Sequence, residues 1–213
     1  WLLSTLLFLL PAKESKADHV MGADIQWKCL GNDTYQIIFK FYRDCRGIPK
    51  SGSVQLQFTS DSCANSRSGT VTCNRVSLVD ITPVCSANKP CNPANTMLPS
   101  IPYGIEEHRF EGKVYLGGTY AACCWYKFTF SECCRSGPIN TGHSWANFST
   151  ELWLNRCITP CDNGPQFNNP PIAIKCAGQD VVYNHGVVDA DGDSLVYVKA
   201  LPNGANYIAP WSV

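Results

Sequence analysis

Thirteen cysteines constrain this chain of 213 residues more than any other feature of its sequence. At this density they indicate disulfides formed in an oxidising compartment. Zinc binding is disfavoured because the sequence has no paired CxxC knuckles. Since thirteen is odd, either one thiol is free or its partner lies beyond Val213. The candidates are Cys29, Cys45, Cys63, Cys73, Cys85, Cys91, Cys123, Cys124, Cys133, Cys134, Cys157, Cys161 and Cys176.

Two cysteine doublets, Cys123-Cys124 and Cys133-Cys134, flank a run of aromatic residues. Adjacent side chains on a strand face opposite ways. We therefore expect one cysteine of each doublet to staple the core and the other to tie an outer loop. Vicinal redox chemistry is the alternative, and it needs an exposed thiolate of low pKa, for which only the nearby Arg135 argues.

The first ten residues, WLLSTLLFLL, form an apolar run that is too short to span a bilayer. In the following PAKESKA, Ser15 and Ala17 are small residues suited to signal-peptidase cleavage. We expect residues 1–17 to be the remnant of a signal peptide and the mature chain to begin near Asp18. This predicts a secreted or outer cell-surface protein without a membrane span in the mature part.

Apolar and polar residues alternate along most of the chain after residue 18, as is typical of half-buried β-strands. The alternation is clearest in residues 54–59, 126–130 and 146–154. Gly31-Asn32-Asp33 separates two such runs and predicts a hairpin. No segment shows a convincing helical stripe. The expected fold is all-β, with a disulfide-rich β-sandwich as its first domain.

Two irregular segments interrupt the strands. Residues 83–104 contain five prolines and are expected to form a long loop pinned by a Cys85–Cys91 bridge. Residues 161–171, CDNGPQFNNPP, have the composition of a domain boundary. We therefore expect the disulfide-rich β-sandwich over residues 18–161, followed over residues 162–213 by the truncated start of an immunoglobulin-like or cadherin-like module.

An aspartate-rich segment suggests a cation site. Asp189, Asp191 and Asp193 alternate along the chain, so an extended backbone would put three carboxylates on one side. Calcium, Ca²⁺, takes six to eight oxygen ligands, and Gly192 permits a tight approach. Completing ligands are expected from neighbouring loops, at Asp162, Asn163 or Asn184. An EF-hand is excluded because Ala200 stands where its final Glu is needed. A solvated Asp-Gly turn is the alternative.

Catalysis and nucleic-acid binding are both disfavoured. The sequence has no GxSxG elbow, no HExxH helix and no Gly-rich phosphate loop. Basic and acidic residues number 17 each, which leaves no overall field to attract nucleic acid. We expect a protein that is not an enzyme.

Trp145 and Trp153 share the parity of polar neighbours in their strand, so we expect them on the outer face of the sheet as a ligand patch. The alternative is that these aromatic residues are simply core. A surface polysaccharide or another cell-surface protein is the expected partner, and self-association is a further option.

Four separated pieces of the chain resemble one family: residues 19–45, ending in YRDC, residues 131–136, SECCRS, residues 161–171, and residues 168–197, which end in DGDSLVY. Together they resemble Bacteroidetes cell-surface proteins, which are large, modular, gliding-motility-associated or adhesin-like cargo of the type 9 secretion system. From Phe167 onward the chain also resembles cadherin-like and polycystic-kidney-disease-type (PKD) modules, in which calcium often stiffens a domain junction.

The resemblance implies an exported, non-catalytic adhesion or structural module that is stiffened by calcium and linked to gliding or attachment. Two alternatives remain open. One is a carbohydrate-binding module of a secreted hydrolase, and the other is a subunit of a surface filament.

Overall fold

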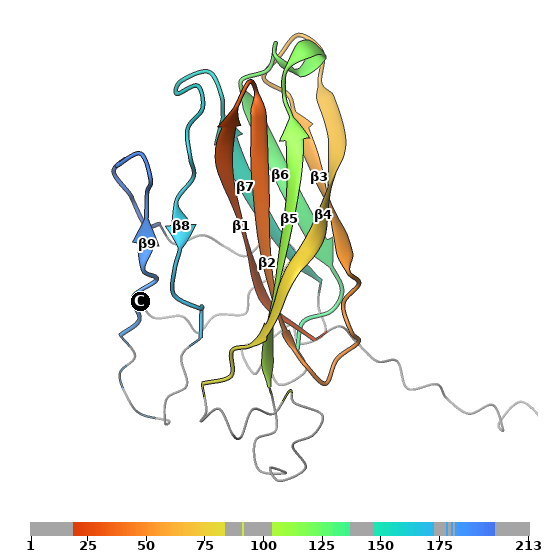
Figure 1. Ribbon diagram of the computed structural model, residues 1–213, viewed down its shortest axis with the longest axis vertical. Helices are drawn as coiled ribbons and strands as arrows, with labels where there is room; N and C mark the ends of the chain where they lie inside the picture. Colours follow the sequence, from red (N-terminus) through yellow and green to blue (C-terminus); the bar gives the residue numbers. More distant parts are fainter. Residues whose placement is uncertain are drawn as a thin grey trace, which may run out of the picture.

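The structure is a computed structural model (Figure 1), and it describes residues 19–83, 91, 104–136, 147–172, 178, 180 and 182–198. The expected signal peptide, Trp145, Cys85 and Cys176 lie outside the described residues.

Seven strands form one antiparallel sheet in the order β1-β2-β5-β4-β3-β6-β7. A short 3-10 helix, η3 (Gly118–Tyr120), lies between β5 and β6, and two short strands, β8 (Gln166–Phe167) and β9 (Val187–Val188), pair separately. The seven strands of the large sheet are β1 (Val20–Gly31), β2 (Thr34–Asp44), β3 (Ser53–Ser60), β4 (Arg67–Asp80), β5 (Ile105–Tyr115), β6 (Trp125–Glu132) and β7 (Phe148–Asn155).

The large sheet curls into a nearly closed barrel. Long antiparallel strands twist strongly, and that twist brings the edge strands β1 and β7 close together, although no ladder joins them in the described residues. The all-β prediction is confirmed. The prediction of two packed sheets for the first domain is wrong, because β1 to β7 belong to one curled sheet. After residue 161, the described residues contain only β8 and β9, and they show no second sandwich.

Aromatic side chains fill the inside of the barrel. The ring of Phe39 lies 4.5 Å from that of Phe130, 6.0 Å from that of Phe110 and 6.1 Å from that of Phe41, measured between centroids. The predicted alternation is confirmed in β3, where every second residue is buried, and in β6 and β7. The inward residues of these strands therefore build one continuous core.

The predicted hairpin joins β1 to β2. Gly31, Asn32 and Asp33 all have positive φ angles, of 83°, 49° and 56°. Glycine adopts this region without steric cost, and Asn and Asp are the residues that tolerate it best. The turn residues therefore explain why the two long strands reverse direction at this point.

Five disulfides join described cysteines: Cys29–Cys161, Cys45–Cys91, Cys63–Cys123, Cys124–Cys157 and Cys133–Cys134. This pairing indicates an oxidising, extracytoplasmic environment. The expected Cys85–Cys91 bridge is wrong, because Cys91 is brought to the end of β2 and pairs with Cys45. Cys73 is a free thiol on the barrel interior, and burial raises its pKa to about 12, so it is a poor nucleophile.

The two doublets behave differently. Cys123 is buried and pairs with Cys63, whereas Cys124 ties the start of β6 to the end of β7 through Cys157. That division of roles was predicted. Cys133 and Cys134 instead pair with each other, so the same prediction is wrong for the second doublet.

The segment that carries β8 and β9 lies against the outer face of β1 and β2 (Figure 1). Lys40 Nζ on β2 donates a 2.8 Å hydrogen bond to the carbonyl of Phe167. Ile38 and Tyr42 face outward on β2, yet each is only 3% exposed. No helix in the described part of the chain is long and apolar enough to cross a membrane.

Candidate functional site

A short loop, residues 161–164, is clamped onto the end of β1. The Cys29–Cys161 disulfide ties it covalently, and the main-chain N–H of Cys29 donates to Asn163 Oδ1 at 3.0 Å. Trp27 Nε1 donates to the carbonyl of Asp162 at 3.1 Å, while the N–H of Gly164 donates to the carbonyl of Trp27. A Cβ on Gly164 would come within 2.3 Å of the indole of Trp27, so this close approach requires glycine.

The predicted aspartate segment forms a turn, not an extended strand. Asp189 Oδ1 accepts hydrogen bonds from the N–H groups of Asp191, at 2.9 Å, and Asp193, at 3.2 Å. Gly192 has a φ of 82°, which reverses the chain. The three carboxylates therefore do not line one side of an extended strand, because the backbone curls around the carboxylate of Asp189.

The clamped loop meets this turn. The main-chain N–H of Asn163 donates to Asp191 Oδ2 at 2.7 Å, and Asn163 Nδ2 lies 3.1 Å from both oxygens of the same carboxylate. These hydrogen bonds, the backbone one first, hold the pKa of Asp191 below its ordinary value. Two segments that the sequence separates by 28 residues thus form one acidic cluster, which consists of Asp162, Asp189, Asp191 and Asp193.

Asp162 has the least favourable environment for a charged carboxylate in the acidic cluster. Burial raises its pKa to about 6, and the negative charges of Asp193, Asp191 and Asp189 add to that effect. Its Oδ1 atom is buried and has no hydrogen-bond partner in the described part of the chain. A cation at this point would satisfy that oxygen and relieve the repulsion.

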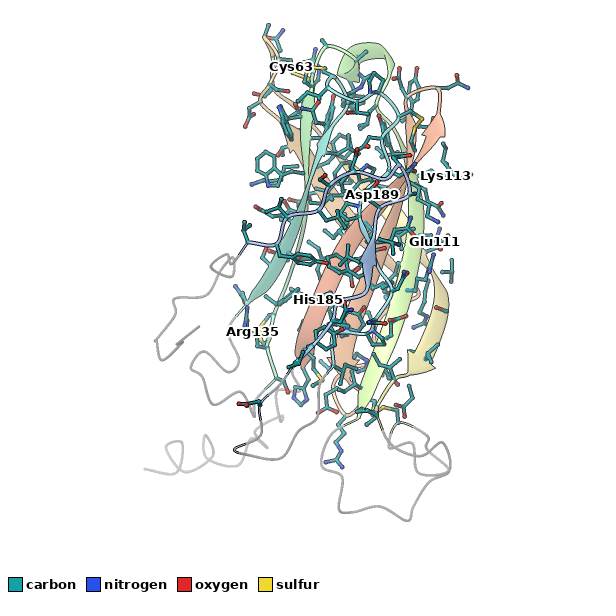
Figure 2. The ribbon with its side chains drawn as sticks, turned by 90° about the vertical axis from the view of Figure 1, so that its left-hand side faces the viewer. Cys63, Glu111, Lys113, Arg135, His185 and Asp189 are labelled. Atoms are coloured by element: carbon teal, nitrogen blue, oxygen red, sulfur yellow. A yellow bond between two sulfur atoms is a disulfide. The ribbon has the colours of Figure 1, made fainter. Side chains whose placement is uncertain are left out.

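The cluster as it stands is not a formed coordination shell. Among the described residues, no three His, Cys, Asp or Glu side chains are arranged to hold a metal ion. Asp162 and Asn163, two of the completing ligands considered above, lie beside the turn. Asn184 makes other contacts, since its Oδ1 accepts from the N–H of Gly186 and its carbonyl accepts from Asn169 Nδ2. Figure 2 shows Asp189 and His185 on the C-terminal segment, in front of the barrel strands.

A second feature is an aromatic cleft on the outer face of β6 and β7. Trp153 is 53% exposed, and Trp125 on the neighbouring strand is 44% exposed. Together with Lys127 and residues 59–62 they line a cleft of about 540 Å³. Sequence parity predicted the outward position of Trp153. Trp125 was a candidate for sugar stacking from its aromatic character alone, although its parity with the polar Lys127 and Thr129 also indicates an outward position.

The YRDC motif is explained by a buried polar network that sequence reasoning did not find. Arg43 Nη2 pairs with Glu106 Oε2 at 2.8 Å, and its Nε lies 3.3 Å from His108 Nε2. Burial lowers the pKa of His108, and the cations of Arg43 and Arg75 lower it further against the opposing effect of Glu106. These groups stabilise one another within the fold, so we assign the network to structure.

Comparison of the chain with protein-family models, curated proteins and solved structures gives no match. The features of the described residues that bear on function are the acidic cluster, the aromatic cleft and the disulfides.

Proposed function

We propose that this chain is an exported, non-catalytic adhesion or structural module whose junction, at residues 161–164 and 189–193, is stiffened by calcium. The sequence resemblance to modular Bacteroidetes surface proteins supports a role in gliding or attachment. The disulfides are consistent with export. In this proposal, residues 162–213 begin an immunoglobulin-like or cadherin-like module.

The observation that carries the proposal is the buried oxygen of Asp162, Oδ1, which has no hydrogen-bond partner among the described residues and lies in the loop that contacts the turn of three further aspartates. The raised pKa of the same carboxyl agrees with it. Calcium prefers carboxylate and carbonyl oxygens, and the acidic cluster supplies four carboxylates within two short loops. Asp191 would exchange its hydrogen bonds with Asn163 for the cation, or would share its oxygens between them. The cation would neutralise the repulsion that Asp193, Asp191 and Asp189 exert on Asp162, and it would offset the loss of hydration that burial of Asp162 causes.

Rigidity follows from the covalent attachment of one loop. Residues 161–164 are fixed to β1 by the Cys29–Cys161 bridge, whereas residues 189–193 contact them through exposed hydrogen bonds. A cation shared by both loops would therefore fix the C-terminal segment relative to the barrel. The function of such a site is mechanical, and no substrate turns over.

The test is thermal unfolding of the chain with calcium, with magnesium and with a chelator. At free calcium a hundred times the dissociation constant, binding stabilises the folded state by about 2.7 kcal/mol. For a chain of this size we expect the melting temperature to rise by about 5–10 °C. Magnesium should act weakly, because it demands a stricter octahedral shell.

Two variants make the test specific. Asp191→Asn combined with Asp193→Asn should remove the calcium response, while Asp61→Asn, which changes an exposed aspartate on the barrel, should retain it. A calcium response that survives the double substitution, or no response in the parent chain, would refute the proposed junction.

A further inference from the structure

The aromatic cleft, defined by Trp125, Trp153, Lys127 and residues 59–62, has two exposed indoles but no assigned role. Exposed apolar patches that are rimmed by polar residues mark interaction sites on soluble proteins. Trp125 precedes the inward-facing Tyr126, and Trp153 lies between the inward-facing Leu152 and Leu154. Both indoles are therefore held on the outside by residues that are locked in the core.

The cleft is rigid on the side of residues 59–62. Ser62 Oγ accepts hydrogen bonds from the N–H groups of Cys124 and Trp125, both at 2.9 Å, and it lies 3.1 Å from Ser60 Oγ. Cys63, the residue after Ser62, forms a disulfide with Cys123, which lies two residues before the start of β6. Figure 2 places Cys63 at the end of the barrel away from Arg135. This side of the cleft is thus organised before any ligand arrives, which reduces the entropic cost of binding.

Trp153 is also held in place. Its Nε1 donates a 3.0 Å hydrogen bond to Glu151 Oε1, and Lys127 Nζ lies 5.4 Å from the centroid of its ring. Lys127 Nζ is in turn 3.8 Å from Glu151 Oε2. A positive charge over an indole face is attracted by the ring quadrupole. Glu151 and Lys127 therefore fix the orientation of the Trp153 ring without burying it.

The polar rim favours a neutral ligand that offers hydroxyl groups. The carboxylate of Asp61 is exposed and makes no hydrogen bond or ion pair within the described residues, so its oxygens are available as acceptors. Thr59 contributes a hydroxyl on the same rim. Lys127 is balanced by Glu151, which leaves the charge of Asp61 uncompensated in the cleft. An anionic ligand would be repelled, and nucleic acid would meet no basic track.

We propose that the aromatic cleft binds a neutral polysaccharide, whose sugar rings stack their C–H faces on Trp125 and Trp153 while Asp61 accepts hydrogen bonds from hydroxyl groups. A pyranose ring presents an apolar face and a rim of hydroxyl groups, which matches flat indoles beside a carboxylate. Because the rim residues are exposed, the cleft is open at the surface and suits a length of chain. This inference rests on the proposed adhesive function and identifies its ligand.

The experiment is affinity electrophoresis of the native chain in gels that contain dextran, mannan or xyloglucan, with alginate as an anionic comparison. This method suits weak interactions with millimolar dissociation constants. We expect at least one neutral polysaccharide to retard the chain. Trp125→Ala and Trp153→Ala should each weaken that retardation at least about five-fold, and Asp61→Asn should weaken it as well.

The matched control is Tyr115→Ala, which removes an aromatic side chain of similar exposure from the end of β5. It should migrate like the parent chain. Each variant is checked by thermal unfolding, so that loss of binding is not confused with loss of the fold.

Three results would overturn the inference: no retardation by any of the three neutral polysaccharides, retardation that survives both tryptophan substitutions, or a preference for alginate. The calcium test is separate, because Asp191→Asn combined with Asp193→Asn should leave polysaccharide binding unchanged. A stabilised junction without retardation would refute the cleft alone, and retardation without a calcium response would refute the junction alone.

Discussion

The Cys29–Cys161 disulfide should contribute more to stability than any single polar contact that it accompanies. Counted along the chain, it closes a loop with a sequence separation of 132 residues, for which chain entropy gives about 5 kcal/mol at 25 °C. That count ignores the other bridges. The double variant with Cys29→Ala and Cys161→Ala lacks this disulfide and can still form the other disulfides.

The remaining bridges shorten the loop. The covalent path runs 34 residues from Cys29 to Cys63, crosses to Cys123, continues one residue to Cys124, crosses to Cys157 and runs four residues to Cys161. A loop of about 40 residues is worth about 4 kcal/mol. For a chain of this size, the loss lowers the melting temperature by about 8–16 °C.

The assay is thermal unfolding by circular dichroism in non-reducing buffer, with the remaining disulfides verified by mass spectrometry. Cys124→Ala combined with Cys157→Ala is the matched comparison, because its loop has a sequence separation of 33 and is also worth about 4 kcal/mol. We expect the two double variants to melt at similar temperatures. A drop of less than about 2 °C for the Cys29 and Cys161 variant would refute the reasoning. It would mean that the loop at residues 161–164 can detach from β1 while the barrel stays folded.

Three further predictions test the core and the titrating groups. Phe39→Ala should lower the free energy of unfolding in urea by about 3–5 kcal/mol, because it leaves a cavity at the centre of the aromatic core. The control Gln55→Ala, at an exposed position of β3, should change it by less than about 0.5 kcal/mol, and a loss below about 1 kcal/mol for Phe39→Ala would contradict the described packing. In the presence of chelator, Asp162→Asn should raise the melting temperature at pH 7.5 but not at pH 4. The pKa of this carboxyl is raised to about 6 in the folded chain, so its contribution destabilises the fold as pH rises from 3.8 to 6, and an equal effect of the substitution at both pH values would contradict the raised pKa. His108 should contribute a loss of stability as pH falls below about 6.5, opposite in sign to the contribution of Asp162, because burial lowers the pKa of His108 among Arg43, Arg75 and Glu106 and the unfolded chain takes up the proton first. Melting curves from pH 7.5 to pH 5 should therefore show the His108→Gln variant gaining stability relative to the parent chain as pH falls, and a constant difference between the two chains would argue against this role.

Strands could be predicted from the sequence because their signal is local. The alternation in β3 and β6, and the positive-φ residues between β1 and β2, depend on near neighbours only. The closure of the sheet could not be predicted, because it depends on β3 pairing with β6, across more than sixty residues. The same limit explains the error at Cys91, whose sequence neighbour Cys85 looked like the simpler partner.

In the candidate site, too, local features could be predicted from the sequence and long-range contacts could not. The aspartates and the irregular composition of residues 161–171 could be recognised in the sequence, and Asp162 and Asn163 were named as possible completing ligands. The contact between Asn163 and Asp191 depends on the hydrogen bond between Trp27 and the carbonyl of Asp162, and no local sequence pattern predicts that hydrogen bond. The aromatic cleft was half predicted, since parity placed Trp153 outside but did not reveal that residues 59–62 would face it.

The Cys29–Cys161 bridge has a consequence for a chain under tension. A pull applied between a point before Cys29 and a point after Cys161 passes directly from β1 into the loop at 161–164 through one covalent bond. Residues 30–160, which include β2 to β7, lie outside the path of the force. Almost the whole barrel is thus shielded from mechanical unfolding, and the chain can lengthen only in the segments that flank the bridge.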